Sequence, residues 1–153
     1  VCADSLFFEP DGSIRMVKPT LRGIGVSKAT SDIQMDRYSG ISETGAAIAY
    51  LDTTNYFAGW KTVFNTPDAW VRYNTVQFDG DCRGVVLRVK APVGGTLLLQ
   101  SGQKTIAKVK VPPTEEWKEI SVRVKGIEKG IHHLTVRSAS EHDTCLDWLR
   151  FTK

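Results

Sequence analysis

The segment WKEISVRVK at residues 117–125 decides the fold class. Its apolar residues Ile120, Val122 and Val124 alternate with polar ones, so all three lie on one face of an extended chain. The same period of two returns along the sequence, whereas no window of about twelve residues has the apolar spacing of an amphipathic helix. The segment therefore predicts a half-buried strand, and its repetition predicts an all-β protein.

Further segments share this alternation and are rich in Val, Ile, Thr and aromatic residues, as strands are. Turn residues such as Gly, Pro, Asp and Asn separate them. Many short strands at near-regular spacing predict a β-sandwich (jelly roll) of mainly antiparallel strands. The expected strands are 5–9, 13–17, 33–41, 46–51, 70–78, 84–90, 95–100, 105–111, 118–125, 131–138 and 145–152.

The composition is that of an ordinary globular domain. Of 153 residues, 41% are hydrophobic and 24% are charged, which excludes a disordered or collagen-like chain. The net charge of +3 is spread through the strand-like segments, and this favours a solvated surface over a nucleic-acid interface. No stretch approaches the ~20 apolar residues of a membrane span. We therefore expect neither nucleic acid nor membrane as a partner.

Residues that perform catalysis are not arranged in any familiar motif. The cysteines Cys2, Cys82 and Cys145 lie far apart, which leaves open a Cys82–Cys145 disulfide or buried free thiols. The three histidines form no HExxH motif, and the sequence has no GxSxG, P-loop or GxGxxG. We expect a protein that is not an enzyme, although the number of acidic residues leaves a two-carboxylate glycosidase open.

Several aromatic residues lie where a solvated strand or loop does not require them. Trp117 lies on the polar face of its strand, together with Glu119 and Ser121. It is therefore a candidate binding platform or a ring that covers the end of the sandwich. The segment 52–69 contains Tyr56 and Trp60, and Tyr50 ends the preceding strand. These rings either form a flap over the core or face a ligand. Aromatic rings bind the C–H face of a pyranose while polar side chains bind its hydroxyls.

A buried acid is the third unusual feature. Asp147 lies between Leu146 and Trp148 in a strand-like segment, while Gln34 and Asp36 project to one side of another. A carboxylate inside an apolar strand must be paired or bind a cation. Three oxygen side chains favour calcium over zinc, and the alternative is a salt bridge to an arginine such as Arg37 or Arg150.

These segments, taken in order, resemble a known family. IQMDRYSG, WVRYNTVQF, GVVLRV, GGTLLL, VPPTEEWKEI, KGIHHLTV and LDWLRF together resemble carbohydrate-binding module family 6 across 33–153. The preceding SLFFEPDGSIRMVKPTLRGIG looks like the stretch that leads out of a family 43 glycoside hydrolase. The resemblance implies a hairpin and linker from an upstream catalytic domain at 1–32, followed by a jelly-roll module at 33–153. The alternative is that the first ~30 residues form the first strands of the same sandwich.

The resemblance also implies a function. It implies a non-catalytic module that binds a plant-type polysaccharide (xylan, arabinan, galactan or β-glucan) and holds the attached hydrolase near it. The protein would be secreted, periplasmic or at the cell surface. A structural calcium ion would be held by Gln34, Asp36 and Asp147. The alternative is an accessory sandwich that packs on the catalytic domain and has a degenerate sugar site.

The sugar site implied by the resemblance departs from the family pattern. Trp117 and Tyr50 match the two aromatic residues of the family's loop cleft, while Cys145 stands at its asparagine position and is a poor partner for a hydroxyl. The long segment after Tyr50, with Tyr56 and Trp60, is expected to rebuild the cleft, to block it, or to leave binding to the concave sheet face.

Overall fold

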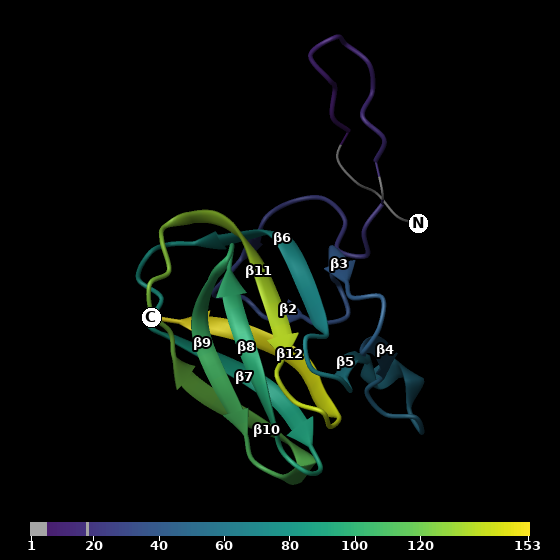
Figure 1. Cartoon of the computed structure of the whole chain (residues 1–153), viewed down its shortest axis with the longest axis vertical. Coiled ribbons are helices and arrows are strands. Elements are labelled where there is room, and N and C mark those ends of the chain that lie inside the picture. Colours follow the sequence, from purple (N-terminus) through teal and green to yellow (C-terminus); the bar gives the residue numbers. More distant parts are fainter. Residues whose placement is uncertain (1–5, 18) are drawn as a thin grey trace.

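The computed structural model describes residues 6–17 and 19–153 and contains two β-sheets packed face to face (Figure 1). The strands are β1 Ser27–Lys28, β2 Ile33–Gln34, β3 Gly40–Ile41, β4 Ala46–Tyr50, β5 Trp60–Phe64, β6 Trp70–Phe78, β7 Gly84–Ala91, β8 Gly95–Ser101, β9 Lys104–Val111, β10 Thr114–Arg123, β11 Gly130–Ser138 and β12 Thr144–Thr152. One short 3-10 helix, η1, covers Tyr56–Ala58. No helix in the described part of the chain is long and apolar enough to cross a membrane.

The two sheets have different strand orders. The first sheet runs β1-β6-β11-β8-β9, with β3 also on β6, and the second runs β10-β7-β12-β5-β4, with β2 also on β12. All pairings are antiparallel except that of β1 with β6. In Figure 1 the β9-β8-β11 side faces the viewer. The predicted β-sandwich of mainly antiparallel strands is confirmed.

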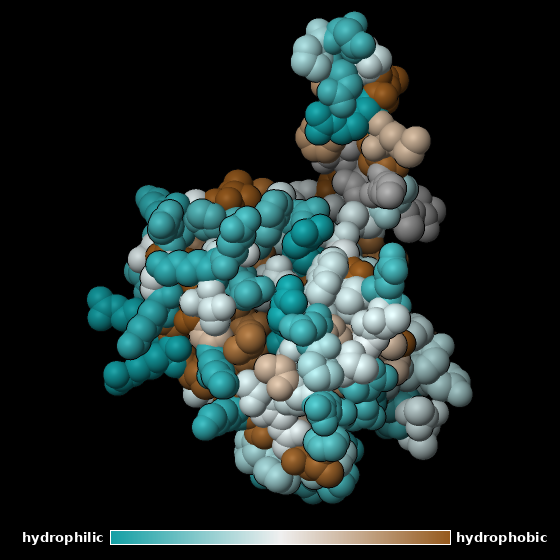
Figure 2. Space-filling view, viewed as in Figure 1, coloured by the Kyte–Doolittle hydropathy of each residue, from teal (hydrophilic) through white to brown (hydrophobic). Residues whose placement is uncertain are grey.

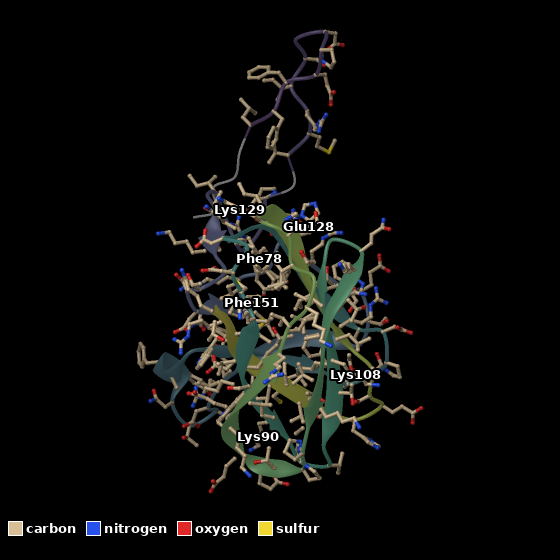
Figure 3. All side chains as sticks on the ribbon, turned by 90° about the vertical axis from the view of Figure 1, so that its left-hand side faces the viewer. Phe78, Lys90, Lys108, Glu128, Lys129 and Phe151 are labelled. Atoms are coloured by element: carbon tan, nitrogen blue, oxygen red, sulfur yellow. The ribbon has the colours of Figure 1, made fainter. Side chains whose placement is uncertain are left out.

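The core lies between the sheets and follows the predicted alternation. On β7, Val85, Leu87 and Val89 have no exposed surface, while the residues between them are half-exposed. Phe78 and Phe151 meet edge to face from opposite sheets, with their ring centroids 5.0 Å apart. Figure 3 shows both rings between the sheets, with Lys108 and Lys90 on opposite outer sides. The period of two therefore separates core from surface correctly.

Two predicted segments differ from the structure. The segment 33–41 is not one strand but two short ones, separated by a turn that buries Met35 completely. The segment 52–69 is not wholly a loop, because it contains η1 and β5, on which Thr62 and Phe64 are buried. Strands 5–9 and 13–17 reduce to one bridge between Phe8 and Ile14 in the described residues.

The sandwich begins before Ile33. β1 pairs with β6, and the buried Ala29 donates its amide to the carbonyl of Gln77. The carbonyl of Ala29 accepts from the amide of Phe151, so this segment bonds to both sheets. By contrast, the hairpin at 6–17 stands away from the sandwich (Figure 1). Assignment of 1–32 to an upstream catalytic domain remains a prediction.

The backbone carbonyl of Met35 joins the two sheets. It accepts hydrogen bonds from Thr62 Oγ1 of β5 at 2.8 Å and from the hydroxyl of Tyr73 of β6 at 2.7 Å. Both side chains are buried, and burial raises the pKa of Tyr73 well above its usual value, so the hydroxyl remains a donor. The turn after β2 therefore rests on one donor from each sheet.

We expect Tyr73→Phe and Thr62→Val each to lower the free energy of unfolding by about 1 kcal/mol, the usual net value of one hydrogen bond. The double variant should lose about 1–2 kcal/mol more than the sum, because the buried carbonyl then lacks both donors. Urea unfolding measures these differences, with the exposed Thr105→Val as a neutral control. Strict additivity of the two substitutions would contradict the shared role of the carbonyl.

Candidate functional site

Three of the predicted site residues form a column of rings on the β4–β5 hairpin. Tyr50 and Trp60 are direct cross-strand partners, and their rings stack with centroids 4.1 Å apart at an interplanar angle of 28°. Tyr56 lies against Tyr50 with centroids 4.5 Å apart at 40°. The rings cover one another, so Tyr50 presents less ring surface to a ligand than an isolated tyrosine would.

Trp117 is not close to this column. The Tyr50–Trp60 pair continues the row of the buried Phe64, on the core-facing side of the hairpin. The ring of Trp117 instead covers the guanidinium of Arg88 on the outward face of the same sheet. Three strands separate β10 from β4, which is about 19 Å at the usual strand spacing. Trp117 and Tyr50 therefore do not face each other across one cleft.

Cys145 lies on the outward face of β12, between Lys90 of β7 and Val63 of β5. Cys145 and Cys82 are both half-buried free thiols, so the alternative of a disulfide between them is wrong. Burial raises the pKa of the Cys145 thiol, which makes it a neutral group at physiological pH. Cys2 lies outside the described residues.

Asp147 has an arginine as its partner. The carboxyl group is 5% exposed and lies where the register of β12 against β7 shifts between Leu146 and Trp148. The guanidinium of Arg88 donates to this carboxylate and lies 5.2 Å from the ring centroid of Trp117. Burial raises the pKa of Asp147, and the guanidinium acts in the opposite direction. The partner is neither Arg37 nor Arg150.

The surroundings of Asp147 bear on the expected calcium ion. Gln34 is the register partner of Trp148, which brings β2 beside Asp147, but one carboxylate oxygen of Asp147 is already bound by Arg88. Within 6–17 and 19–153, no three His, Cys, Asp or Glu residues form a group that could hold a metal. A fixed guanidinium at this place opposes a divalent cation. The negative charges of Asp36 and Asp32 also act on Asp147 and raise its pKa. The structure therefore shows an ion pair at Asp147, and the calcium ion expected at Gln34, Asp36 and Asp147 is not confirmed.

The outward face of the first sheet contains a hollow of about 420 Å³. Figure 2 looks onto this side of the molecule, where hydrophilic side chains predominate. The hollow lies over β6, β11 and β8 and extends to the turn between β8 and β9. Its lining residues are Trp70, Arg72, Gln100, Gly102, Gln103, Thr135 and Arg137. It therefore combines an indole with amide, hydroxyl and guanidinium groups.

The register explains how these side chains meet. Trp70 pairs with Arg137 across β6 and β11, and Arg72 pairs with Thr135 in the next outward row. Thr135 also pairs with Gln100 of β8, so this row crosses three strands. The guanidinium of Arg72 lies 5.4 Å from the ring centroid of Trp70. The hollow is therefore formed by neighbouring positions of a regular sheet.

Sequence reasoning placed Trp70 in a strand but did not select it as a site residue. The sequence does contain a signal for Trp70. Trp70 lies on the same face of its strand as the exposed Arg72, whereas Val71 and Tyr73 lie on the opposite face and are buried. The same parity argument identified Trp117. The other lining residues, on β8 and β11, become neighbours only through strand pairing, which parity does not reveal.

We expect Arg88→Met to lower the free energy of unfolding by about 3 kcal/mol or more, because it leaves a buried carboxylate without its partner. Asp147→Asn should cost no more than about 1 kcal/mol, since the amide still accepts a hydrogen bond and Arg88 is partly solvated.

The same carboxyl group predicts a pH dependence. Because the folded-state pKa of Asp147 is raised, its contribution to stability should increase as the pH falls through that pKa, and Asp147→Asn should abolish this increase. Denaturant unfolding across the acidic range measures both; equal losses in the two variants would contradict the asymmetry.

A chelator should leave the protein's thermal stability unchanged. Since Arg88 occupies the carboxylate of Asp147, we expect excess EGTA to shift the Tm by less than about 1 °C. Differential scanning fluorimetry with and without added CaCl₂ provides the measurement. A fall in Tm on chelation that calcium restores would show that the ion displaces Arg88.

Comparison of the sequence with protein-family profiles and with curated proteins finds no match. Similar solved structures include a family 6 carbohydrate-binding module from Clostridium stercorarium in complex with cellobiose, with a TM-score of 0.74 and 18% identity over 84% of this chain and 98% of that one. A β-1,3-glucan-binding family 6 module from Bacillus halodurans has a TM-score of 0.74 and 21% identity, covering 84% of this chain and 100% of that one.

A family 43 glycoside hydrolase from Bacillus subtilis, an arabinoxylan arabinofuranohydrolase in complex with cellotetraose, is also similar in structure. It has a TM-score of 0.75 and 16% identity, and the match covers 98% of this chain but 33% of that chain. This chain thus corresponds in fold to about a third of that enzyme. The protein described here therefore has the fold of the family 6 carbohydrate-binding modules.

Proposed function

We propose that this chain is a non-catalytic carbohydrate-binding module whose sugar site is the hollow lined by Trp70. The observation that carries the proposal is the combination in one hollow of an indole, two amides and a hydroxyl on the outward face of a rigid sheet. A pyranose offers an apolar C–H face and a rim of hydroxyl groups, and this lining offers partners for both.

The contacts in the hollow allow a sugar to reach the indole. Arg72 is exposed, and its contact with the ring of Trp70 is worth about 0.5–1 kcal/mol at such a site. A sugar ring that stacks there gives up that amount while it buries apolar surface. Gln100 and Gln103 supply both donors and acceptors to hydroxyl groups. Affinity for a short oligosaccharide should be modest, with a Kd of roughly 10⁻³ to 10⁻⁵ M.

The similar structures support the ligand class and the attachment. One neighbour is described in complex with cellobiose and another as a β-1,3-glucan binder. The larger Bacillus subtilis neighbour is a glycoside hydrolase, which supports a role of this chain in holding a hydrolase near a plant-type polysaccharide such as xylan, arabinan, galactan or β-glucan. Tethering raises the effective concentration of a weak binder on a polymer. A polymeric substrate favours a secreted, periplasmic or cell-surface location.

The residues selected from the sequence define rival positions for the sugar. The column of Tyr50, Tyr56 and Trp60 is one surface, and the outward face around Trp117 and Cys145 is another. Trp117 is covered by Arg88, which Asp147 holds in place, whereas the arginine over Trp70 is exposed and has no such carboxylate in the described residues. Tyr50 contacts the rings of Tyr56 and Trp60. We therefore place the site at Trp70 and treat the other two surfaces as controls.

Trp70→Ala should weaken binding at least about fivefold, since it removes the aromatic ring of the hollow, and stacking on an aromatic ring is worth about 1–3 kcal/mol. Isothermal titration calorimetry and affinity electrophoresis against xylan, arabinan, galactan and β-glucan measure the effect. Trp117→Ala and Trp60→Ala are the matched controls and should bind like wild type.

Each outcome separates the alternatives. A loss confined to Trp117→Ala or Trp60→Ala would move the site to that surface and refute the hollow. Absence of wild-type binding to every neutral and acidic glycan would favour the accessory sandwich that packs on a catalytic domain. Hydrolysis of a glycan by the purified chain would contradict a non-catalytic role.

A further inference from the structure

We infer that the hollow around Trp70 recognises an acidic sugar, and that Arg72 and Arg137 bind the carboxylate of a uronic acid unit in the polysaccharide. This inference rests on the proposed function, because it names the ligand class of the same site. It starts from the charge of the lining, which contains two arginines and no acidic residue.

The register of β6 and β11 makes the two arginines neighbours on one face. Arg72 is the register partner of Thr135, and Arg137 is two residues further along β11. They are thus diagonal neighbours on one face of an antiparallel pair, with Cβ atoms about 7–8 Å apart. Arginine side chains are long enough to converge from this separation on a single carboxylate between them.

The positive charge of this pair is poorly compensated within the protein. Arg72 forms no ion pair with any residue in the described ranges, and its guanidinium lies over the ring of Trp70. Arg137 reaches Asp68 through Nη1 at 3.3 Å, but the Asp68 side chain is 84% exposed, so this pair is weak. The Nε of Arg137 is buried and has no hydrogen-bond partner among the described atoms. A guanidinium presents five donors, and within the described part of the chain the structure gives Arg137 a hydrogen bond from Nη1 alone.

The other arginines that stack on tryptophans differ from this pair. Arg88 over Trp117 is neutralised by the buried Asp147, and Arg150 over Trp148 is bonded to Asp32 at 2.9 Å. These arginines have carboxylate partners, whereas Arg72 over Trp70 has none among residues 6–17 and 19–153. The hollow therefore has the charge of an anion site rather than that of a structural ion pair.

The surrounding face reinforces this charge. Lys108 and Lys110 of β9 pair with Leu98 and Thr96 of β8, beside the hollow, and both lysines are exposed. Figure 3 shows Lys108 projecting outward on this side. Clustered charge of one sign raises the local concentration of an oppositely charged ligand. A neutral sugar chain uses the indole and the amides, while an acidic unit also uses the two arginines.

A carboxylate fits the arginine pair well in chemistry. Arginine binds planar carboxylates through two parallel hydrogen bonds, and hydrogen bonds to charged groups contribute about 1.5–3 kcal/mol each. One such contact corresponds to roughly tenfold or more in affinity. A sulfate ester on a sugar presents similar oxygens, so the experiment includes it as a separate arm.

The test compares glucuronoxylan with the same polymer after its carboxyl groups have been reduced to alcohols. Calorimetry and affinity electrophoresis should show at least about tenfold tighter binding to the acidic form, and the preference should shrink as salt is raised. Arg72→Gln and Arg137→Gln should each lose most of the preference for the acidic polymer. Arg123→Gln, an exposed arginine on the other sheet, is the charge-matched control and should keep it.

The outcomes distinguish the inference from the proposed function. Equal binding of both polymers by wild type would refute the acidic ligand and leave the carbohydrate-binding function intact. Binding of neither polymer, nor of any other glycan, would refute the function itself. Tighter binding to a sulfated galactan than to glucuronoxylan would overturn the assignment to a carboxylate. Thermal unfolding of each variant verifies that a loss is not caused by unfolding.

Discussion

A buried backbone carbonyl, that of Met35, is the constraint on which much of this sandwich depends. A carbonyl removed from water must find donors, and this one takes a hydroxyl from each sheet, from Thr62 and Tyr73. The amide of Met35 donates to the carbonyl of Asp147 in β12. One short turn therefore ties β5, β6 and β12 together, and it fixes β2 against the part of β12 where the register shifts.

The period of two predicts most of the fold because most strands bury one face only. It fails where burial has another origin. The turn at Met35 is held by hydrogen bonds from Thr62 and Tyr73 on distant strands to the Met35 carbonyl. Neighbouring residues in the sequence therefore do not reveal the break between β2 and β3. In β5 a buried position is occupied by Thr62, a polar residue, which hides the alternation that Phe64 would otherwise indicate.

The candidate site was only partly predictable for a related reason. Parity tells which face of a strand a residue occupies, so it marks both Trp117 and Trp70 as outward rings. It does not tell which side chains lie on the neighbouring strands. Asp147 was correctly expected to need a partner, but that Arg88 is this partner follows from strand pairing at the register shift of β12. The rings of Tyr50 and Trp60 likewise find each other through register alone.

The outward faces differ in whether their arginines already have carboxylate partners, and this difference decides where an anionic ligand binds most favourably. Around Trp117 and Trp148 each arginine already has a carboxylate, so a ligand there must replace an existing interaction. Around Trp70 a ligand competes only with a solvent-exposed stacking contact and with the weak, exposed ion pair of Arg137 and Asp68. Because an unpaired guanidinium beside a second one raises the energy of the free protein, an anionic ligand lowers that energy as well as forming new bonds. Selectivity for acidic sugars then follows from the absence of a carboxylate in the lining, without any further specialised residue.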